Sequence, residues 1–312
     1  SEGSRKMLKN ITKRFVSTVV VLIGVSIMAF ALVRLGGGDP ARLMLSETAT
    51  EAQVQAQRVK MGLDRPYVEQ YLTYMKGILT GDLGYSYNYK MPVSTLIMNR
   101  LPYTAKLAGC AMLFSLLFSI PLGVIAGVKK GTGVDVFATF WALLGQSLSP
   151  VWLGLLLILL FGVTLRWLPT QGSDGIKNII MPAICLAFQF SSLATRMTRS
   201  GMVDVLQEDY ITATRARGVG RHEINVKYAF KNALLPVVTV IGSQVGSMLA
   251  GSMVIESLFG WPGMGQLTIT AINARDFQLV QSSLLFSAFV FVLCNLIVDI
   301  LYTFIDKRVK FS

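Results

Sequence analysis

Apolar residues in this chain fall into six long stretches that contain no Asp, Glu, Lys or Arg. A helix crosses the hydrocarbon core of a membrane with about 20 apolar residues, because lipid offers no partner to backbone N–H and C=O groups. Each stretch is long enough for one crossing. The pattern therefore predicts an all-α fold, a polytopic membrane helix bundle with six transmembrane helices. The stretches are residues 15–33, 107–128, 136–165, 178–195, 232–255 and 277–298.

The third stretch, residues 136–165, is longer than one straight crossing requires. A helix with such a surplus must tilt, kink or include a re-entrant piece. Proline removes a backbone donor and clashes with the preceding turn, so it interrupts a helix. We expect the break in this stretch at Pro150.

The first two stretches are separated by a long outer segment, residues 34–106, in which we expect short helices. Residues 50–61 predict one helix, capped by the hydroxyl of Thr50. Residues 66–79 predict a second helix, because proline is favoured at the first helical position and Pro66 stands there.

Apolar and aromatic residues recur along the second of these helices at spacings of three and four, which places them on one face. They are Tyr67, Tyr71, Tyr74 and Ile78. Such a stripe is expected to pack on the bundle or to rest at the membrane interface, where Tyr is favoured. Contact with a transported substrate is the alternative interpretation.

Composition excludes an ordinary soluble domain. The chain has 312 residues, of which 15% are charged, and its mean hydropathy is +0.55. These values are typical of a membrane protein. We expect a single permease domain over residues 7–312, preceded by an expression remnant at residues 1–6. Such a domain leaves no room for a separate catalytic module.

The net charge of +12 is unevenly distributed over the loops. Positive residues concentrate in 1–14, 129–135, 196–231 and 299–312, whereas the short outer loops carry only Arg166, Lys177 and Arg275. Cytoplasmic loops carry the excess of Lys and Arg, so both termini are predicted to lie inside. The basic residues then report orientation and contact with anionic lipid in the bilayer. Nucleic acid is not an expected partner.

Residues that carry metal or redox chemistry are scattered. Cys110, Cys185 and Cys294 fall in three different stretches, and His222 is the only histidine. We expect no metal site, since no paired spacing occurs. The chain also lacks a Walker A motif and a G-x-G-x-x-G motif, so it is not expected to hydrolyse nucleotide or to be an enzyme.

The largest inner loop, residues 196–231, has helical character from Glu208 to Arg217 and is interrupted by Gly218. Small residues allow a partner surface to approach closely, and flanking charges fix its orientation. The residues alone leave two interpretations open: a helix that docks a cytoplasmic partner, or an amphipathic loop that faces lipid.

The motifs of this loop resemble those of a known family. E-D-Y-I-T-A-T-R-A-R-G followed by K-N-A-L-L-P is similar to the coupling segment of ABC importer permeases, specifically the B-type permease of the dipeptide/oligopeptide/nickel family. R-L-G-G-G-D-P-A, M-G-L-D-R-P, G-D-L-G-Y-S and G-S-M-V-I-E-S-L-F-G-W-P-G-M-G-Q-L agree with it. One departure is Thr212-Ala213-Thr214, where the general importer signature has Glu-Ala-Ala.

The resemblance implies a type I permease core in a bacterial inner membrane. It further implies a paralogous second permease forming a heterodimer, two cytoplasmic ATPase subunits that bind ATP and Mg, and an extracytoplasmic binding protein. No cofactor is expected on this chain. The ATPase-coupling residues implied within 204–222 are Glu208, Asp209, Tyr210, Ala213, Arg215, Ala216, Arg217 and Gly218.

Polar residues inside the stretches are candidates for the lining of the translocation pathway, because they are costly in lipid. The candidates are Gln146, Ser149, Gln189, Ser243, Gln244, Ser247 and Glu256. Hydrogen bonding between helices is the alternative role. Short peptides are the expected substrate, with nickel, a metal chelate or glutathione as alternatives. A secondary transporter, a channel or a membrane enzyme would need clustered ionisable residues within the stretches, which this sequence lacks.

Overall fold

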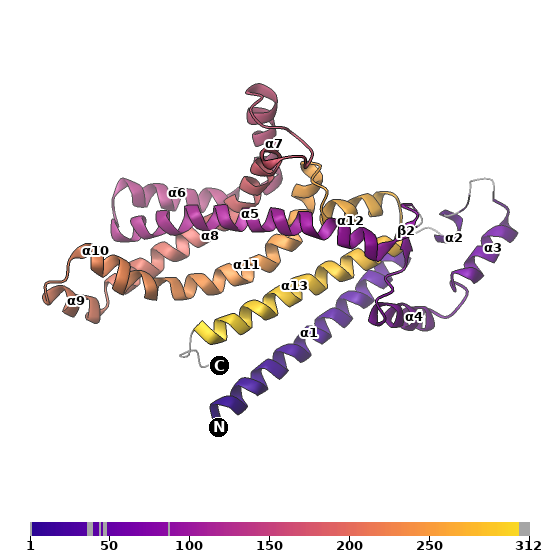
Figure 1. Cartoon of the computed structure of the whole chain (residues 1–312), viewed down its shortest axis with the longest axis horizontal. Helices are drawn as coiled ribbons and strands as arrows, with labels where there is room; N and C mark the ends of the chain where they lie inside the picture. Colours follow the sequence, from indigo (N-terminus) through magenta and orange to yellow (C-terminus); the bar gives the residue numbers. More distant parts are fainter. Residues whose placement is uncertain (1, 36–39, 44, 46–48, 87, 306–312) are drawn as a thin grey trace. The chain divides into compact units, whose positions relative to one another are not determined.

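The structure is a computed structural model that describes residues 2–35, 40–43, 45, 49–86 and 88–305. Some helical side chains also lie outside this description, including those of Ser243 and of every residue after 298. Helices dominate the described residues (Figure 1), and the sheet among them is a single antiparallel pair, β1 (Tyr85–Ser86) with β2 (Met91–Pro92). The prediction of an all-α fold is confirmed.

The chain divides into two compact units, which we describe separately. The first comprises Ser1–Thr104 and Pro262–Val292, and the second comprises Ala105–Trp261 and Leu293–Ser312. Two helices, α5 (Val93–Val128) and α13 (Phe277–Ile305), contribute residues to both. The expected single permease domain stays a prediction.

The first unit contains α1 (Glu2–Leu35), α2 (Pro40–Leu43), α3 (Glu51–Lys60), α4 (Tyr67–Leu79) and α12 (Met264–Asn273). Its core joins the start of α5 to α12 and the start of α13 through Val93, Ile97, Leu267, Ala271 and Leu279.

The two helices of the outer segment match their predictions closely. Thr50 caps α3, and the amide of Gln53 donates to its hydroxyl while the side chain of Gln53 accepts from the amide of Thr50. Helix α4 begins at Tyr67, one residue later than predicted, because Pro66 stands at the cap position before the first helical residue. Local signals placed both helices because caps and proline act within one turn.

The aromatic stripe of α4 packs within the first unit, as the first interpretation predicts. The hydroxyl groups of Tyr71 and Ser26 lie 2.7 Å apart, and the Tyr71 ring meets the edge of Phe30 at 5.5 Å between centroids. The Tyr74 hydroxyl donates to the backbone oxygen of Gln281 at 3.4 Å. Tyr67 remains exposed. The stripe therefore joins α4 to α1 and α13.

The second unit contains α6 (Gly133–Ser147), α7 (Pro150–Leu157), a π-helical turn at Ile158–Thr164, and α8 (Ile176–Leu206). It continues through α9 (Asp209–Ala216), α10 (Arg221–Glu223), a second π-helical turn at Ile224–Ala229, and α11 (Phe230–Leu258). Helix α8 packs against both α6 and α11 (Figure 1). The largest buried cluster gathers around α8 and α11 and includes Met181, Ile255 and Trp261.

The predicted spans lie in helices. Three helices among the described residues are long and apolar enough to cross a membrane: Val93–Val128, Ile176–Leu206 and Phe277–Val298. The third predicted stretch forms the pair α6 and α7, bent by 104° immediately before Pro150, so the expected break there is confirmed. The first and fifth stretches lie within α1 and α11, which include side chains outside the described set.

Candidate functional site

Helix α9 occupies the part of the inner loop that the sequence singled out. Glu208 stands before it with extended backbone, and Asp209 begins it, where a negative charge is favoured by the helix dipole. Gly218 follows with φ +83°, a left-handed conformation that glycine adopts without strain. The helix is therefore short because both of its ends are specified locally.

A single side chain of α9 is buried. Ile211 is fully enclosed and packs in a cluster with Met202 of α8, with Ile224 and Ala229 of the π-helical turn, and with Ala233 of α11. Burying an Ile side chain contributes about 1.5–3 kcal/mol. Ile211 therefore fastens α9 to three other segments of the second unit.

Tyr210 adds a polar attachment beside this cluster. Its hydroxyl accepts a hydrogen bond from the Asn232 amide at 2.8 Å and donates to the backbone oxygen of Tyr228 at 3.4 Å. The Asn232 amide also donates to that backbone oxygen at 3.1 Å. The start of α9 is thus held against the segment that leads into α11.

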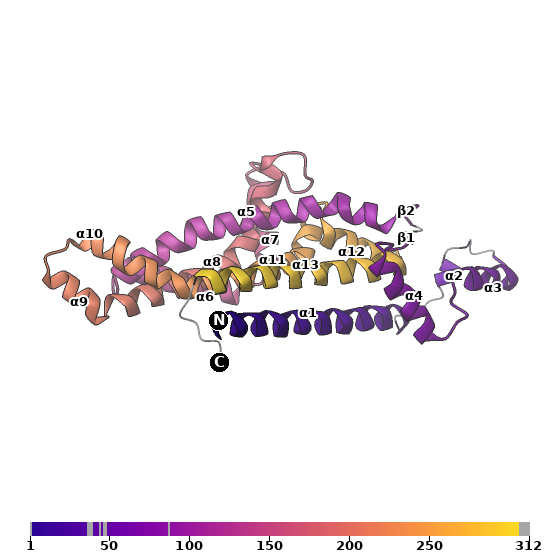
Figure 2. The ribbon, with the colours of Figure 1, turned by 60° about the horizontal axis from the view of Figure 1, so that its bottom comes forward.

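The structure leaves the rest of α9 open. All the predicted coupling residues are exposed: Glu208, Asp209, Tyr210, Ala213, Arg215, Ala216, Arg217 and Gly218. Helices α9 and α10 lie together beyond the ends of α8 and α11 (Figure 2). The arrangement presents carboxylates, guanidinium groups and small residues on one short, anchored helix, which suits a protein surface as partner.

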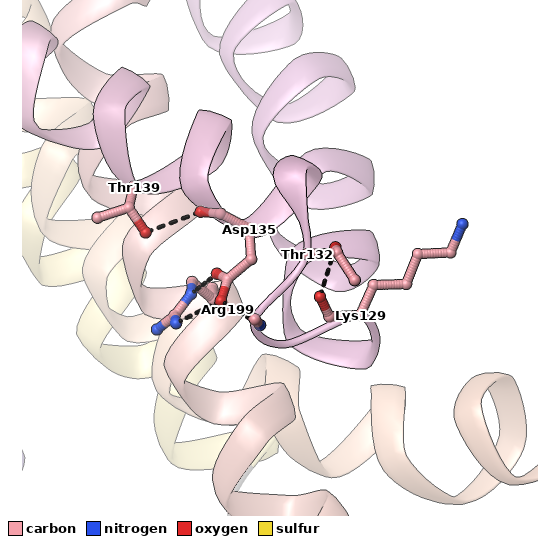
Figure 3. Close-up of polar contacts among 6 residues, drawn as sticks. Lys129, Thr132, Asp135, Thr139 and Arg199 are labelled. Carbon is pink, nitrogen blue, oxygen red and sulfur yellow. Dashed lines mark hydrogen bonds and ion pairs between the residues drawn. The ribbon is translucent and has the colours of Figure 1, made fainter.

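A pair of charged residues near this loop was not singled out from the sequence. The carboxylate of Asp135, in the first turn of α6, accepts two hydrogen bonds from the Arg199 guanidinium of α8 (Figure 3). The bond from Nη2 to Oδ2 is 3.0 Å long, and the amide of Gly131 donates to the same Oδ2 at 2.9 Å. The one signal in the sequence is that each residue lies just beyond an uncharged stretch.

The pathway candidates occupy different environments within the second unit. Gln146, Ser149, Gln189 and Ser247 are exposed, and Arg196 donates to the Gln146 side chain at 3.4 Å. Gln244 is buried, and the side chain of Ser243 lies outside the described residues. The pathway candidates therefore do not share one environment on this chain.

Glu256 lies in the interior of the second unit. Its side chain is fully buried, and its carboxylate accepts a hydrogen bond from Ser252 at 3.0 Å within α11. The sequence predicts a position at the outer end of a span, where contact with substrate is one interpretation. In this chain it forms internal hydrogen bonds.

Two serines of the fourth predicted stretch, Ser191 and Ser192, form hydrogen bonds to a neighbouring helix. The Ser192 hydroxyl donates to the backbone oxygen of Trp141 at 3.2 Å, and the Trp141 indole donates to the Ser191 hydroxyl at 3.2 Å. Ser192 also fills the space beside Gly145, where any larger side chain would collide with it. These serines connect α8 to α6, which is the role of the alternative interpretation.

The first unit contains a pocket of about 780 Å³. Positive residues outnumber negative ones in its lining, which includes Arg34, Lys90 and Arg275. Tyr74 also borders it, and burial raises the pKa of this phenol to about 12. Substrate contact by the aromatic stripe stays a prediction.

Two family profiles together match most of the chain. The binding-protein-dependent transport system inner membrane component matches residues 119–311, and the N-terminal membrane component of such systems matches residues 7–108. The first match contains α9, the Asp135–Arg199 pair and every pathway candidate.

Curated relatives match over nearly the whole length. The dipeptide transport system permease protein DppB of Alkalihalophilus pseudofirmus is 36% identical, over 98% of this chain and 100% of the relative. DppB of Escherichia coli strain K12 is also 36% identical, over 97% and 99%. The glutathione transport system permease protein GsiC of Pectobacterium atrosepticum is 37% identical, over 98% and 100%.

A solved structure shares the fold. The inward-facing MetNI methionine ABC transporter contains a chain that superposes with a TM-score of 0.56, at 16% identity, over 68% of this chain and 96% of that one. At this identity the likeness concerns the fold alone, since sites diverge on a shared fold.

Proposed function

This chain belongs to the family of inner-membrane components of binding-protein-dependent transport systems, and we propose that it forms half of the pathway through which an ABC importer takes up short peptides. The relatives named for dipeptide and for glutathione transport support this substrate class, since both substrates are small peptides. Glutathione itself, nickel or a metal chelate is the alternative cargo of the same architecture.

The proposed coupling function rests on one observation: α9 is anchored to the second unit while most of its side chains are exposed. Ile211 and Tyr210 attach the helix to α8 and α11, while its charged and small residues face outward. An anchored helix transmits force because it moves as a rigid body with the elements it is packed against. We infer that residues 208–218 insert into a groove of an ATPase subunit.

The remaining parts of the importer lie on other chains. We propose a heterodimer with a paralogous permease, two ATPase subunits that bind ATP and Mg, and an extracytoplasmic binding protein that delivers the peptide. In this arrangement the present chain is a non-catalytic subunit of a bacterial inner membrane. Both of its termini and the loop at residues 196–231 face the cytoplasm.

The exposed pathway candidates fit a lumen that two permeases enclose jointly. Four of them lie at the surface of this chain: Gln146, Ser149, Gln189 and Ser247. At the surface they are available to face a lumen between this permease and the second one. Polar groups at such positions replace the water around a peptide backbone. Gln244 and Glu256 are buried in this chain and do not belong to this exposed set.

The test is charge reversal on α9 and at the residue directly after it, in the complete importer reconstituted in proteoliposomes. Arg215→Glu and Arg217→Glu should lower ATP-driven uptake of a labelled dipeptide by about tenfold or more, because a lost charge-assisted bond costs roughly 1.5–3 kcal/mol. ATP hydrolysis should then persist without its stimulation by loaded binding protein.

Lys227→Glu serves as the matched control, since Lys227 is exposed in the same loop but lies beyond α9. Normal dipeptide uptake and normal stimulation in both arginine variants would contradict the coupling assignment. Uptake of a nickel chelate but of no dipeptide by the unaltered importer would contradict the peptide assignment.

A further inference from the structure

We propose that Asp135 and Arg199 are positioning residues that form a joint, through which movement of α9 reaches the α5–α6 hairpin. The proposal rests on the proposed coupling function of α9. It adds the route by which displacement at the ATPase-facing helix enters the membrane-spanning part of the second unit.

The joint is enclosed and directional. The side chain of Asp135 is 9% exposed and that of Arg199 is 29% exposed, so the pair is shielded more than a surface ion pair. A guanidinium that forms two bonds with a carboxylate fixes the angle as well as the distance between them. In Figure 3 the side chain of Lys129 points away from the carboxylate, and Arg199 is the labelled cation that reaches it.

The turn that carries Asp135 is itself stiffened. The amide of Gly131 donates to the Asp135 carboxylate, and the Thr132 hydroxyl donates to the backbone oxygen of Lys129 at 2.7 Å. Further along α6, the Thr139 hydroxyl donates to the backbone oxygen of Asp135 at 2.9 Å. A force on the carboxylate is therefore shared by the whole turn and by the first two turns of α6.

Close backbone packing places α5 on the same part of α8. A Cβ atom at Gly123 would lie 2.6 Å from Cβ of Thr198, and one at Gly127 would lie 2.5 Å from Cβ of Met202. Small residues four positions apart let two helices approach in this way. The hairpin thus meets α8 on two sides, through glycines on α5 and through the ion pair on α6.

Met202 connects this joint to α9. It lies against Gly127 of α5 and in the same buried cluster as Ile211 of α9. Only Gln207 and Glu208 separate α8 from α9 along the chain. Displacement of α9 therefore acts on the last two turns of α8, and Arg199 lies at the start of those turns, facing Asp135.

Variants that remove or exchange the two charges of the pair provide the experiment. Asp135→Asn, Arg199→Gln and the exchanged double variant Asp135→Arg/Arg199→Asp are placed in the complete importer. The readout is the number of labelled dipeptides taken up per ATP hydrolysed, measured beside basal ATP hydrolysis. Each single variant should lower this ratio by about 5- to 150-fold, the usual range for coupled sites. The exchanged pair should restore at least part of the loss.

A merely structural role predicts a different result. It would lower the melting temperature or the yield of assembled complex while leaving the transport ratio of the assembled fraction unchanged, and that result overturns the proposal. Arg199→Lys covers the case in which the other variants do not assemble, because it keeps the charge but loses the paired geometry. A normal ratio in Arg199→Lys would also overturn a directional joint.

The Arg215→Glu variant separates this proposal from the function on which it rests. If Arg215→Glu abolishes stimulation while Asp135→Asn transports normally per ATP, the joint is refuted and the coupling helix stands. If Arg215→Glu itself behaves normally, the coupling assignment fails and the joint fails with it.

Discussion

At the scale of single residues, Ile211 is the apolar side chain that anchors α9, whereas its neighbours along the chain are exposed. It is the buried side chain of the helix, and the residues on either side of it, Tyr210 and Thr212, are exposed. Its loss leaves a cavity among Met202, Ile224 and Ala229, because well-packed neighbours relax only partly. Ile211 is therefore the apolar anchor of α9, beside the polar attachment that the Tyr210 hydroxyl supplies.

Replacing Ile211 by Ala should destabilise this cluster by about 2–5 kcal/mol, the usual range for a buried Ile-to-Ala change. Limited proteolysis should then cut faster within residues 204–222, and stimulated uptake should fall with it. Thr212→Ala is the control, since that side chain is exposed. Equal protease resistance in both variants would show that Ile211 does not fasten α9.

At the scale of elements, the start of α3 in the outer segment is determined by side chains close to it in the sequence. In α3 the hydroxyl of Thr50 and the amide side chain of Gln53 satisfy each other's backbone N–H groups. Free N–H groups at a helix start otherwise need water or another partner. The cap therefore determines where α3 begins, independently of the membrane spans.

Thr50→Ala removes this cap and should cost α3 about 1 kcal/mol, which corresponds to roughly fivefold faster amide hydrogen exchange in that helix. Gln55→Ala, in the exposed middle of α3, should leave the exchange rates nearly unchanged because Ala is a good helix former. Slower or equal exchange in Thr50→Ala would contradict the capping assignment.

At the scale of the whole molecule, the loop charges predict which side of the membrane each segment faces. The outer segment that holds α3 and the inner loop that holds α9 are separated by three predicted spans. An odd number of crossings places them on opposite faces. Orientation then decides whether α9 meets a cytoplasmic ATPase at all.

Single cysteines test this orientation after Cys110, Cys185 and Cys294 are replaced by Ala. Lys60→Cys, at the end of α3, should react with a membrane-impermeant maleimide in intact spheroplasts, and His222→Cys should react only after permeabilisation. Both positions are exposed, so access depends on the side of the membrane. Labelling of His222→Cys in intact spheroplasts would reverse the proposed topology.

Local signals explain what the sequence could predict. The cap at Thr50, the start of α4 after Pro66 and the bend before Pro150 each depend on residues within one or two turns. The sequence also predicts a short helix that exposes charged and small residues. Four such residues of α9 are exposed in the structure: Asp209, Ala213, Arg215 and Ala216. These features need no knowledge of distant parts of the chain.

Pairing between distant residues explains what could not be predicted. Asp135 and Arg199 lie 64 positions apart. The residues around each one give no pattern that predicts which partner it binds. Glu256 follows a predicted span, yet α11 turns it into the interior, where Ser252 reaches it. Helix rotation is set by the summed packing of a bundle, which a single sequence does not reveal.

The way α9 is fastened has a consequence for how such importers diversify. Because Ile211 and the Tyr210 hydroxyl hold the helix, the other side chains proposed to recognise an ATPase subunit, at residues 213 and 215–217, lie outside the cluster that anchors it. If the proposed coupling role holds, mutations at those positions should change the choice of ATPase subunit without weakening the anchor of the helix. A library restricted to residues 213 and 215–217 is therefore a route to permeases that respond to a foreign ATPase subunit and ignore their own.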